Sequence, residues 1–208
     1  MIFSHRRAFL ALAFCSVFVG VARAQDDSAI SKPLEALYGG LEAVMKAGKA
    51  TPFTQRFETL APVVEAAFDL STILKVSVGL RWDSMDGQTR DALLRAFQRF
   101  TVATYVASFD KYDGERFEVL PGARESGTDR VVRTEIVPTT GDRIRLDYDM
   151  RNENGQWRAV DVLIDGSISR VAVQRSDFRK LLASGDAPAL IASLRRKVAD
   201  LSDGALSS

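Results

Sequence analysis

Carboxylates are the side chains of this sequence with the clearest capacity for chemistry. Asp147 and Asp149 stand two residues apart, as on one face of a strand, and Asp161 and Asp165 follow in the next apolar segment. Paired carboxylates can supply the acid and the base of glycoside hydrolysis. Asp147 and Asp149, however, alternate with apolar residues and share their expected face with arginines, so the pattern favours a solvated charged face for this pair.

Asp161 is harder to explain because it interrupts an apolar strand. A carboxylate there needs a partner, either a backbone amide or an arginine such as Arg175. The alternative is an enzyme on a cone-shaped fold of helices and sheet, acting on a small apolar substrate, in which Asp161 or Asp69 is the general base and a tyrosine donates to an oxyanion. That reading requires an acid and a base that converge in one pocket.

Histidine and cysteine occur once each, at His5 and Cys15. Both lie in a segment with the pattern of a cleavable signal peptide: Arg6-Arg7, an apolar run, and Ala-Arg-Ala at residues 22–24. We therefore expect residues 1–24 to be removed on export to the periplasm, by the general route or by the twin-arginine route that Arg6-Arg7 also fits. The mature chain then cannot build a Ser-His-Asp triad, a Cys nucleophile, a disulfide or a His/Cys zinc site, and we expect no metal and no cofactor.

The composition of the mature chain limits its partners and its size class. Removal of residues 1–24 takes Lys+Arg from 28 to 25 against 27 Asp+Glu, so the net charge is near −2 and nothing indicates nucleic acid. No later segment is apolar for long enough to span a bilayer. About 184 residues can bury one core, which predicts a single domain over residues 25–202, a flexible tail over residues 203–208, and a monomer.

Helical spacing dominates the N-terminal half. Apolar residues keep that spacing over residues 34–45, and Gly48 ends the segment. Thr51-Pro52 predicts the next helix start, with Thr51 as the cap. Pro62 is expected to restart the chain for a short turn.

Two further helices are expected before the period changes. Ser71 is the expected cap of a short helix that Gly79 ends. The longest helix is predicted from about residue 84 to residue 110. Its apolar stripe comprises Leu93, Phe97, Phe100, Ala103 and Val106.

Beyond residue 112 the apolar period becomes two. Residues 143–151 alternate apolar and charged side chains, which predicts a strand with one buried and one solvated face. Asn154-Gly155 is typical of the turn of a hairpin, which continues into a strand over residues 157–165. Two more strands are predicted over residues 116–120 and 130–137, completing a four-stranded antiparallel sheet.

Two helices are expected to close the chain. One covers residues 169–183, and the other is capped by Asp186 with Pro188 in its first turn. A basic cluster, Arg195–Lys197, near the end of the last helix either complements the helix dipole or contacts a headgroup or partner. The predicted fold class is α+β: N-terminal helices including one long helix, a four-stranded antiparallel curved sheet, and C-terminal helices that together enclose an apolar pocket.

The second half of the chain resembles a known family. The relevant residues are Trp157-Arg158-Ala159-Val160-Asp161-Val162, Gly166, Ile168-Ser169, Val171 and Arg175-Ser176-Asp177-Phe178. Matching positions earlier in the chain are Phe68-Asp69-Leu70, Gly79, Trp82, Gln88-Thr89-Arg90, Phe97 and Thr104-Tyr105. This set is similar to the MlaC (toluene-tolerance) family of periplasmic lipid carriers. One extra residue between Gly166 and Ser169, Arg170 and Gln174 depart from the family pattern, and they resemble the hopanoid-associated HpnM-like branch.

The resemblance implies a lipid-binding carrier and no enzyme. Such a protein shuttles phospholipid or hopanoid-type lipid between inner and outer membrane, with an inner-membrane lipid transporter and an outer-membrane lipid complex as partners. Elementary energetics agree, because moving an acyl chain out of water is worth ~0.8 kcal/mol per methylene. Two tails of roughly sixteen carbons then represent on the order of 25 kcal/mol, so a carrier needs a deep apolar slot and no catalytic groups.

Nine side chains form the predicted lining of that slot. They are Ile144, Leu146 and Tyr148 of the third strand, Val162 and Ile164 of the fourth, Ile168 and Val171 beyond it, and Tyr105 and Phe109 of the long helix. Ile144 and Ile168 match family pocket residues most directly, and we expect them to flank the opening. The alternative is that each of these residues is ordinary core.

Overall fold

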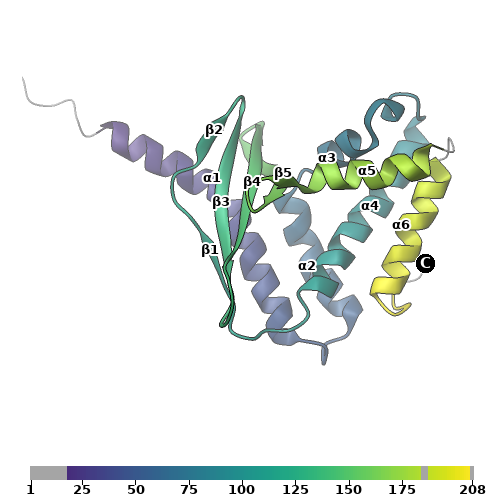
Figure 1. Cartoon of the computed structure of the whole chain (residues 1–208), viewed down its shortest axis with the longest axis horizontal. Coiled ribbons are helices and arrows are strands. Elements are labelled where there is room, and N and C mark those ends of the chain that lie inside the picture. The colour runs from purple at the N-terminus through teal and green to yellow at the C-terminus, as the bar shows by residue number, and fades with distance from the viewer. Residues whose placement is uncertain (1–17, 184–186, 207–208) are drawn as a thin grey trace, which may run out of the picture.

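The computed structural model describes residues 18–183 and 187–206 (Figure 1). Most of the predicted signal peptide, the cap expected at Asp186 and the last two residues of the expected tail lie outside this range. Figure 1 shows an antiparallel sheet with α2, α4 and α6 to one side of it, and α5 beside α3. The α+β fold class predicted from the sequence is confirmed.

Within the described residues, six α-helices and one short 3-10 helix form the helical part. They are α1 (Phe18–Ala47), α2 (Phe53–Ala67), α3 (Leu70–Val78), η1 (Gly79–Trp82), α4 (Gly87–Ser108), α5 (Arg170–Leu182) and α6 (Ala187–Leu201). The longest is α1, with 30 residues against 22 in α4, so the expectation for α4 was wrong. The reason is that α1 begins at Phe18, before the predicted cleavage site, and continues without a break into the amphipathic segment.

Pro62 does not restart the chain but lies inside α2. Proline removes one backbone hydrogen bond from a helix interior. Leu60 and Val64 on either side of it are fully buried, and tertiary packing of an apolar face outweighs local propensity. Phe53 begins this helix, and Thr51 donates to the Ala47 carbonyl instead of capping α2.

Aspartates cap α3 and α4. Asp69 Oδ1 accepts from the Thr72 amide at 2.9 Å, so Asp69 takes the place expected for Ser71. Asp86 Oδ1 accepts from the Thr89 amide at 2.8 Å and sets the start of α4. Each carboxylate satisfies an orphan helix donor and complements the helix dipole. The predicted end of α3 at Gly79 is confirmed, since Gly79 has φ 70°.

In the described part of the chain the sheet has six strands where four were expected. They are β1 (Arg116–Val119), β2 (Arg124–Ser126), β3 (Asp129–Val137), β4 (Ile144–Glu153), β5 (Gln156–Ile164) and β6 (Ile168–Ser169). The order is β1-β3-β4-β5-β6, and β2 pairs with β3. The four predicted strands are present within two residues of their expected ends. Strands of three and two residues, as in β2 and β6, are too short for alternation to reveal.

Pairing around β4 separates the sheet into two different faces. Leu146 lies opposite Thr134 and Ile164, and Tyr148 lies between Val132 and Val162. The alternate positions of the same strands carry charge: Arg145 lies opposite Glu135, and Asp147 opposite Arg133. The apolar face packs on α1 and α2, whose fully buried residues form one core with it. These core residues are Leu34, Leu37, Leu41, Leu60 and Val64.

Candidate functional site

Six of the nine predicted lining residues share the apolar face of the sheet. Ile144, Leu146 and Tyr148 alternate along β4. Their neighbours across the sheet belong to the same set, because Val162 pairs with Tyr148, Ile164 with Leu146, and Ile168 with Ile164. The register therefore brings together residues of β4 and β5 that the sequence separates by 14 and 18 positions.

Burial along this face is graded from core to surface. Tyr148 is 2% exposed and belongs to the packed core, as does Val171 at the start of α5. Leu146, Val162 and Ile164 are half-buried. Ile144 and Ile168 are 46% and 51% exposed. The two residues expected to flank an opening thus lie at the solvent edge of the apolar face, and Tyr148 lies at its inner end.

Six aromatic rings contact one another between the sheet and the helices. We call them the aromatic cluster: Tyr38, Phe68, Tyr105, Phe109, Phe117 and Tyr148. Consecutive ring centroids lie 4.9 to 6.2 Å apart, within the range of favourable aromatic pairs. Tyr38, Phe68 and Tyr148 are buried, whereas Tyr105, Phe109 and Phe117 are half-buried. The cluster therefore has an inner half in the core and an outer half that reaches the surface.

The inner half of the cluster carries a small hydroxyl network. The Tyr38 and Thr134 hydroxyl oxygens lie 2.5 Å apart, and the Tyr38 hydroxyl donates to Tyr148 at 3.2 Å. Burial raises the pKa of both phenols and that of Tyr105. All three tyrosines are therefore neutral at physiological pH, and none serves as a general base.

Three members of the cluster were not predicted as lining. Tyr38 and Phe68 were expected in the helical half of the chain, and Phe117 in the first strand, and none of the three was predicted to contact the ligand. Tyr38 could have been found, because it is the only aromatic residue in an otherwise aliphatic helical stripe and its hydroxyl needs a partner when buried. Nothing local in the sequence indicates that Phe117 stacks on Tyr38, 4.9 Å away.

Asp161 and Asp69, the candidate general bases, are both engaged in local structure. Asp161 Oδ1 accepts from the Val162 and Val171 amides at 2.7 and 3.1 Å, and Ser169 Oγ donates to Asp161 Oδ2. The expected backbone partner of Asp161 is thus confirmed. Arg175 is no partner of this carboxylate but lies beside Gly79. Asp161 ties β5 to the start of α5, where Ser169 is the N-cap.

The charged face of the sheet differs from the solvated row that was expected. Asp147 is buried, because Arg145 donates to both its oxygens at 2.8 and 2.6 Å and Arg124 approaches Oδ2 at 3.2 Å. The hydrogen bonds from Arg145 lower the pKa of Asp147. Asp149 Oδ1 is buried with no hydrogen-bond partner, and burial raises the pKa of this carboxyl group. Asp161 and Asp149 lie opposite each other across the β4–β5 pair.

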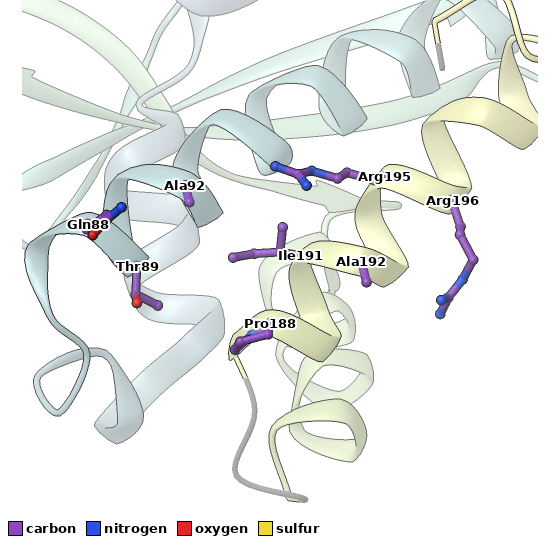
Figure 2. Close-up of a pocket in the computed structure, with 8 residues that line it drawn as sticks. All are labelled: Gln88, Thr89, Ala92, Pro188, Ile191, Ala192, Arg195 and Arg196. Carbon is purple, nitrogen blue, oxygen red and sulfur yellow. The ribbon is translucent and has the colours of Figure 1, made fainter. Parts of the chain in front are cut away.

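Two surface hollows lie away from the apolar face. The larger, of about 530 Å³, is between the start of α4 and α6 (Figure 2). The second, of about 310 Å³, is between the end of α3 and α5. Neither is lined by any of the nine predicted residues. Within residues 18–183 and 187–206, no three or more His, Cys, Asp or Glu side chains are arranged to hold a metal ion, and no helix has the length and apolar character to cross a bilayer.

Comparison with known proteins gives one family and a similar solved fold. The family model described as "MlaC protein" matches residues 37–196, from the second half of α1 into α6. No curated protein sequence matches the chain. A phospholipid-binding protein from Ralstonia solanacearum, solved in complex with a phospholipid, has a similar fold with a TM-score of 0.71, at 16% identity over 84% of this chain and 97% of that one. With the family model covering more than half of the sequence, this chain belongs to the MlaC family.

Proposed function

We propose that this protein is a periplasmic lipid-binding carrier that holds the acyl part of a lipid against the apolar face of the sheet. The observation that carries the proposal is the graded face itself, which is free of charge from Tyr148 to Ile144 and Ile168 at the solvent edge. Apolar surface left half in water is typical of a binding site. The solved phospholipid complex of the Ralstonia solanacearum protein supports the same reading on a similar fold.

The outer half of the aromatic cluster is the proposed entry for the acyl chain. Tyr105 and Phe109 close α4, and Phe117 lies on β1, so the three come from elements joined by a loop. Their half-buried rings pack against the same core as Leu146 and Val162. An acyl chain that displaces water from these groups gains ~0.8 kcal/mol per methylene.

Arg170 supports an anionic headgroup as the outer part of the ligand. It is exposed, it follows Ile168 by two residues, and its charge acts on Tyr105 of the aromatic cluster. Guanidinium groups bind phosphate through paired hydrogen bonds. This position favours a phospholipid over a hopanoid with an uncharged headgroup, although the departures at Arg170 and Gln174 first suggested the hopanoid-associated branch. Transfer between an inner-membrane transporter and an outer-membrane complex, after removal of residues 1–24, belongs to the same proposal.

Lipid analysis of protein purified from the periplasm tests this function. Organic-solvent extraction followed by mass spectrometry is expected to release phospholipid in stoichiometric amount, and a hopanoid would correct the ligand class. Protein that is lipid-free as purified, and that takes up no lipid from mixed micelles, would refute the carrier. The enzyme alternative predicts turnover that depends on Asp161 or Asp69, but both carboxylates already accept backbone hydrogen bonds.

A further inference from the structure

The local backbone conformation keeps the Leu80 side chain exposed to solvent. It lies in η1, directly after α3, and its side chain is 93% exposed, the most of any large apolar residue in the described part of the chain. Gly79 before it has φ 70°, a conformation that other residues rarely adopt, so the chain turns there and Leu80 projects outward. A single exposed leucine is ordinary on a protein surface. The arginines around Leu80 distinguish it from such an isolated residue.

Three arginines surround the hollow beside Leu80. Arg81 follows it in η1, and Arg175 and Arg179 stand one turn apart on α5. All three are exposed, and none of the described residues that line this hollow of about 310 Å³ is a carboxylate. Among the ion pairs of the described residues none involves these arginines. We call Leu80, Arg81, Arg175 and Arg179 the Leu80 surface.

We propose that the Leu80 surface docks on a bilayer that contains anionic phospholipid. Guanidinium groups bind phosphate oxygens in pairs, and a projecting leucine enters the interfacial region between headgroups. Three arginines that form no ion pair with another described residue, placed around one exposed leucine, fit a fluid layer of anionic headgroups. The mature chain has a net charge near −2, so the attraction is local and does not follow from overall charge.

The position of α5 links this surface to the apolar face of the sheet. Ile168 and Arg170 stand at its start, and Arg179 lies nine residues further, roughly 14 Å along the helix. A protein docked through the Leu80 surface therefore has the Ile168 edge within one helix length of the membrane. This consequence for lipid exchange rests on the proposed function, whereas docking itself does not.

Vesicle flotation tests the docking. Protein is mixed with vesicles of phosphatidylcholine alone or with one-third phosphatidylglycerol, and the bound fraction is measured at low and high salt. We expect binding only to the anionic vesicles, weakening as salt rises. Each cation near an anionic surface contributes about fivefold in affinity, so Arg175→Gln with Arg179→Gln is expected to lose about 25-fold. Leu80→Ser is also expected to weaken binding to the anionic vesicles relative to the native protein.

The matched control changes two other exposed arginines by the same charge. Arg195 and Arg196 line the larger hollow on α6 (Figure 2), and Arg195→Gln with Arg196→Gln should leave vesicle binding unchanged. Equal loss in both double variants, or no binding of the native protein to anionic vesicles, would overturn the proposal. Far-UV circular dichroism checks the folding of each variant. Lipid extracted from the Arg175 and Arg179 double variant should match the native protein, so this test and the test of the carrier fail independently.

Discussion

A charge introduced at Ile144 or Ile168 tests the placement of the ligand most directly. Both side chains are about half exposed, at 46% and 51%. Full burial of an isoleucine side chain is worth about 1.5–3 kcal/mol, so losing the buried half costs about 1 kcal/mol of unfolding free energy. Ile144→Asp and Ile168→Asp should therefore remain folded, with a modestly lower melting temperature.

The expected effect on lipid binding is much larger. In the proposed complex the new carboxylate faces acyl tails and loses water without gaining a partner, which costs several kcal/mol. A penalty of about 3 kcal/mol corresponds to more than 100-fold in affinity. Each variant should thus lose nearly all extractable lipid while its helical circular dichroism signal stays close to that of the native protein.

Loading of delipidated protein with a fluorescent phospholipid measures this difference. Val173→Asp on α5 is the matched control, because Val173 is 41% exposed and lies off the sheet. Asp149→Ala on the charged face should also leave loading intact. Photo-crosslinkers at positions 144 and 168 should capture lipid. Capture only by crosslinkers on the charged face, with none at these two positions, would show that the ligand face has been assigned to the wrong side.

Two other sets of substitutions separate structural carboxylates from catalytic ones. Asp161→Asn weakens a site with three hydrogen-bond donors and should lower the unfolding free energy by about 2 kcal/mol. Asp69→Asn should lower it by less than about 1 kcal/mol, because asparagine is an equally good helix cap. Neither variant should change the lipid content, and loss of a defined turnover with intact folding would favour the enzyme. Burial raises the pKa of Asp149, so the native state holds its proton to higher pH than the unfolded state and loses stability as pH rises through that window. Asp149→Asn should therefore raise the unfolding free energy at pH 7 by about 1 kcal/mol. Asp147→Asn should lower the unfolding free energy at pH 7, because the pKa of Asp147 is depressed in the native state. The stabilisation from a depressed pKa is present above the pKa of the unfolded state and is lost as pH falls through the native pKa. Thermal melts across this pH range would contradict both statements if the melting temperatures of the two variants shifted in the same direction.

Turn chemistry and alternation predicted the central hairpin correctly. Asn154 and Gly155 both have positive φ, 54° and 84°, as the turn between β4 and β5 requires. Once that turn is set, the period of two decides which residues of β4 face the helices. The shared face of Ile144, Leu146 and Tyr148 could therefore be read from local sequence alone.

Contacts between distant segments could not be read in the same way. Tyr38 and Phe117 stack although they are far apart in the chain, because α1 and β1 meet only in the folded structure. Periodicity within a helix indicates which side is buried but not which element covers it. The aromatic cluster was thus half predicted: its members on β4 and α4 were found, and those on α1, β1 and the α2–α3 junction were not.

Burial of Asp147 shows the same limit in a charged group. Alternation placed it on the polar face correctly, but alternation does not show that Arg145, two residues earlier on β4, donates to both of its oxygens. Arg124 covers one carboxylate oxygen from β2, a strand of three residues that leaves no pattern in the sequence. Side-chain partners across strands decide whether a polar-face residue is exposed, and those partners depend on the register of the whole sheet.

The uses of the carboxylates support a carrier more strongly than the expected removal of His5 and Cys15 does. Catalysis needs an acid or a base that is free to exchange a proton with a bound substrate. Here Asp69 and Asp161 hold helix starts, Asp147 is locked by arginines, and Asp149 lies on the charged face, opposite in orientation to the aromatic cluster. Among the described residues, the apolar face carries aliphatic groups, phenols whose pKa burial raises, and the Thr134 hydroxyl. A sheet that keeps its charge on one side and its apolar surface on the other can bind a lipid chain and release it unchanged.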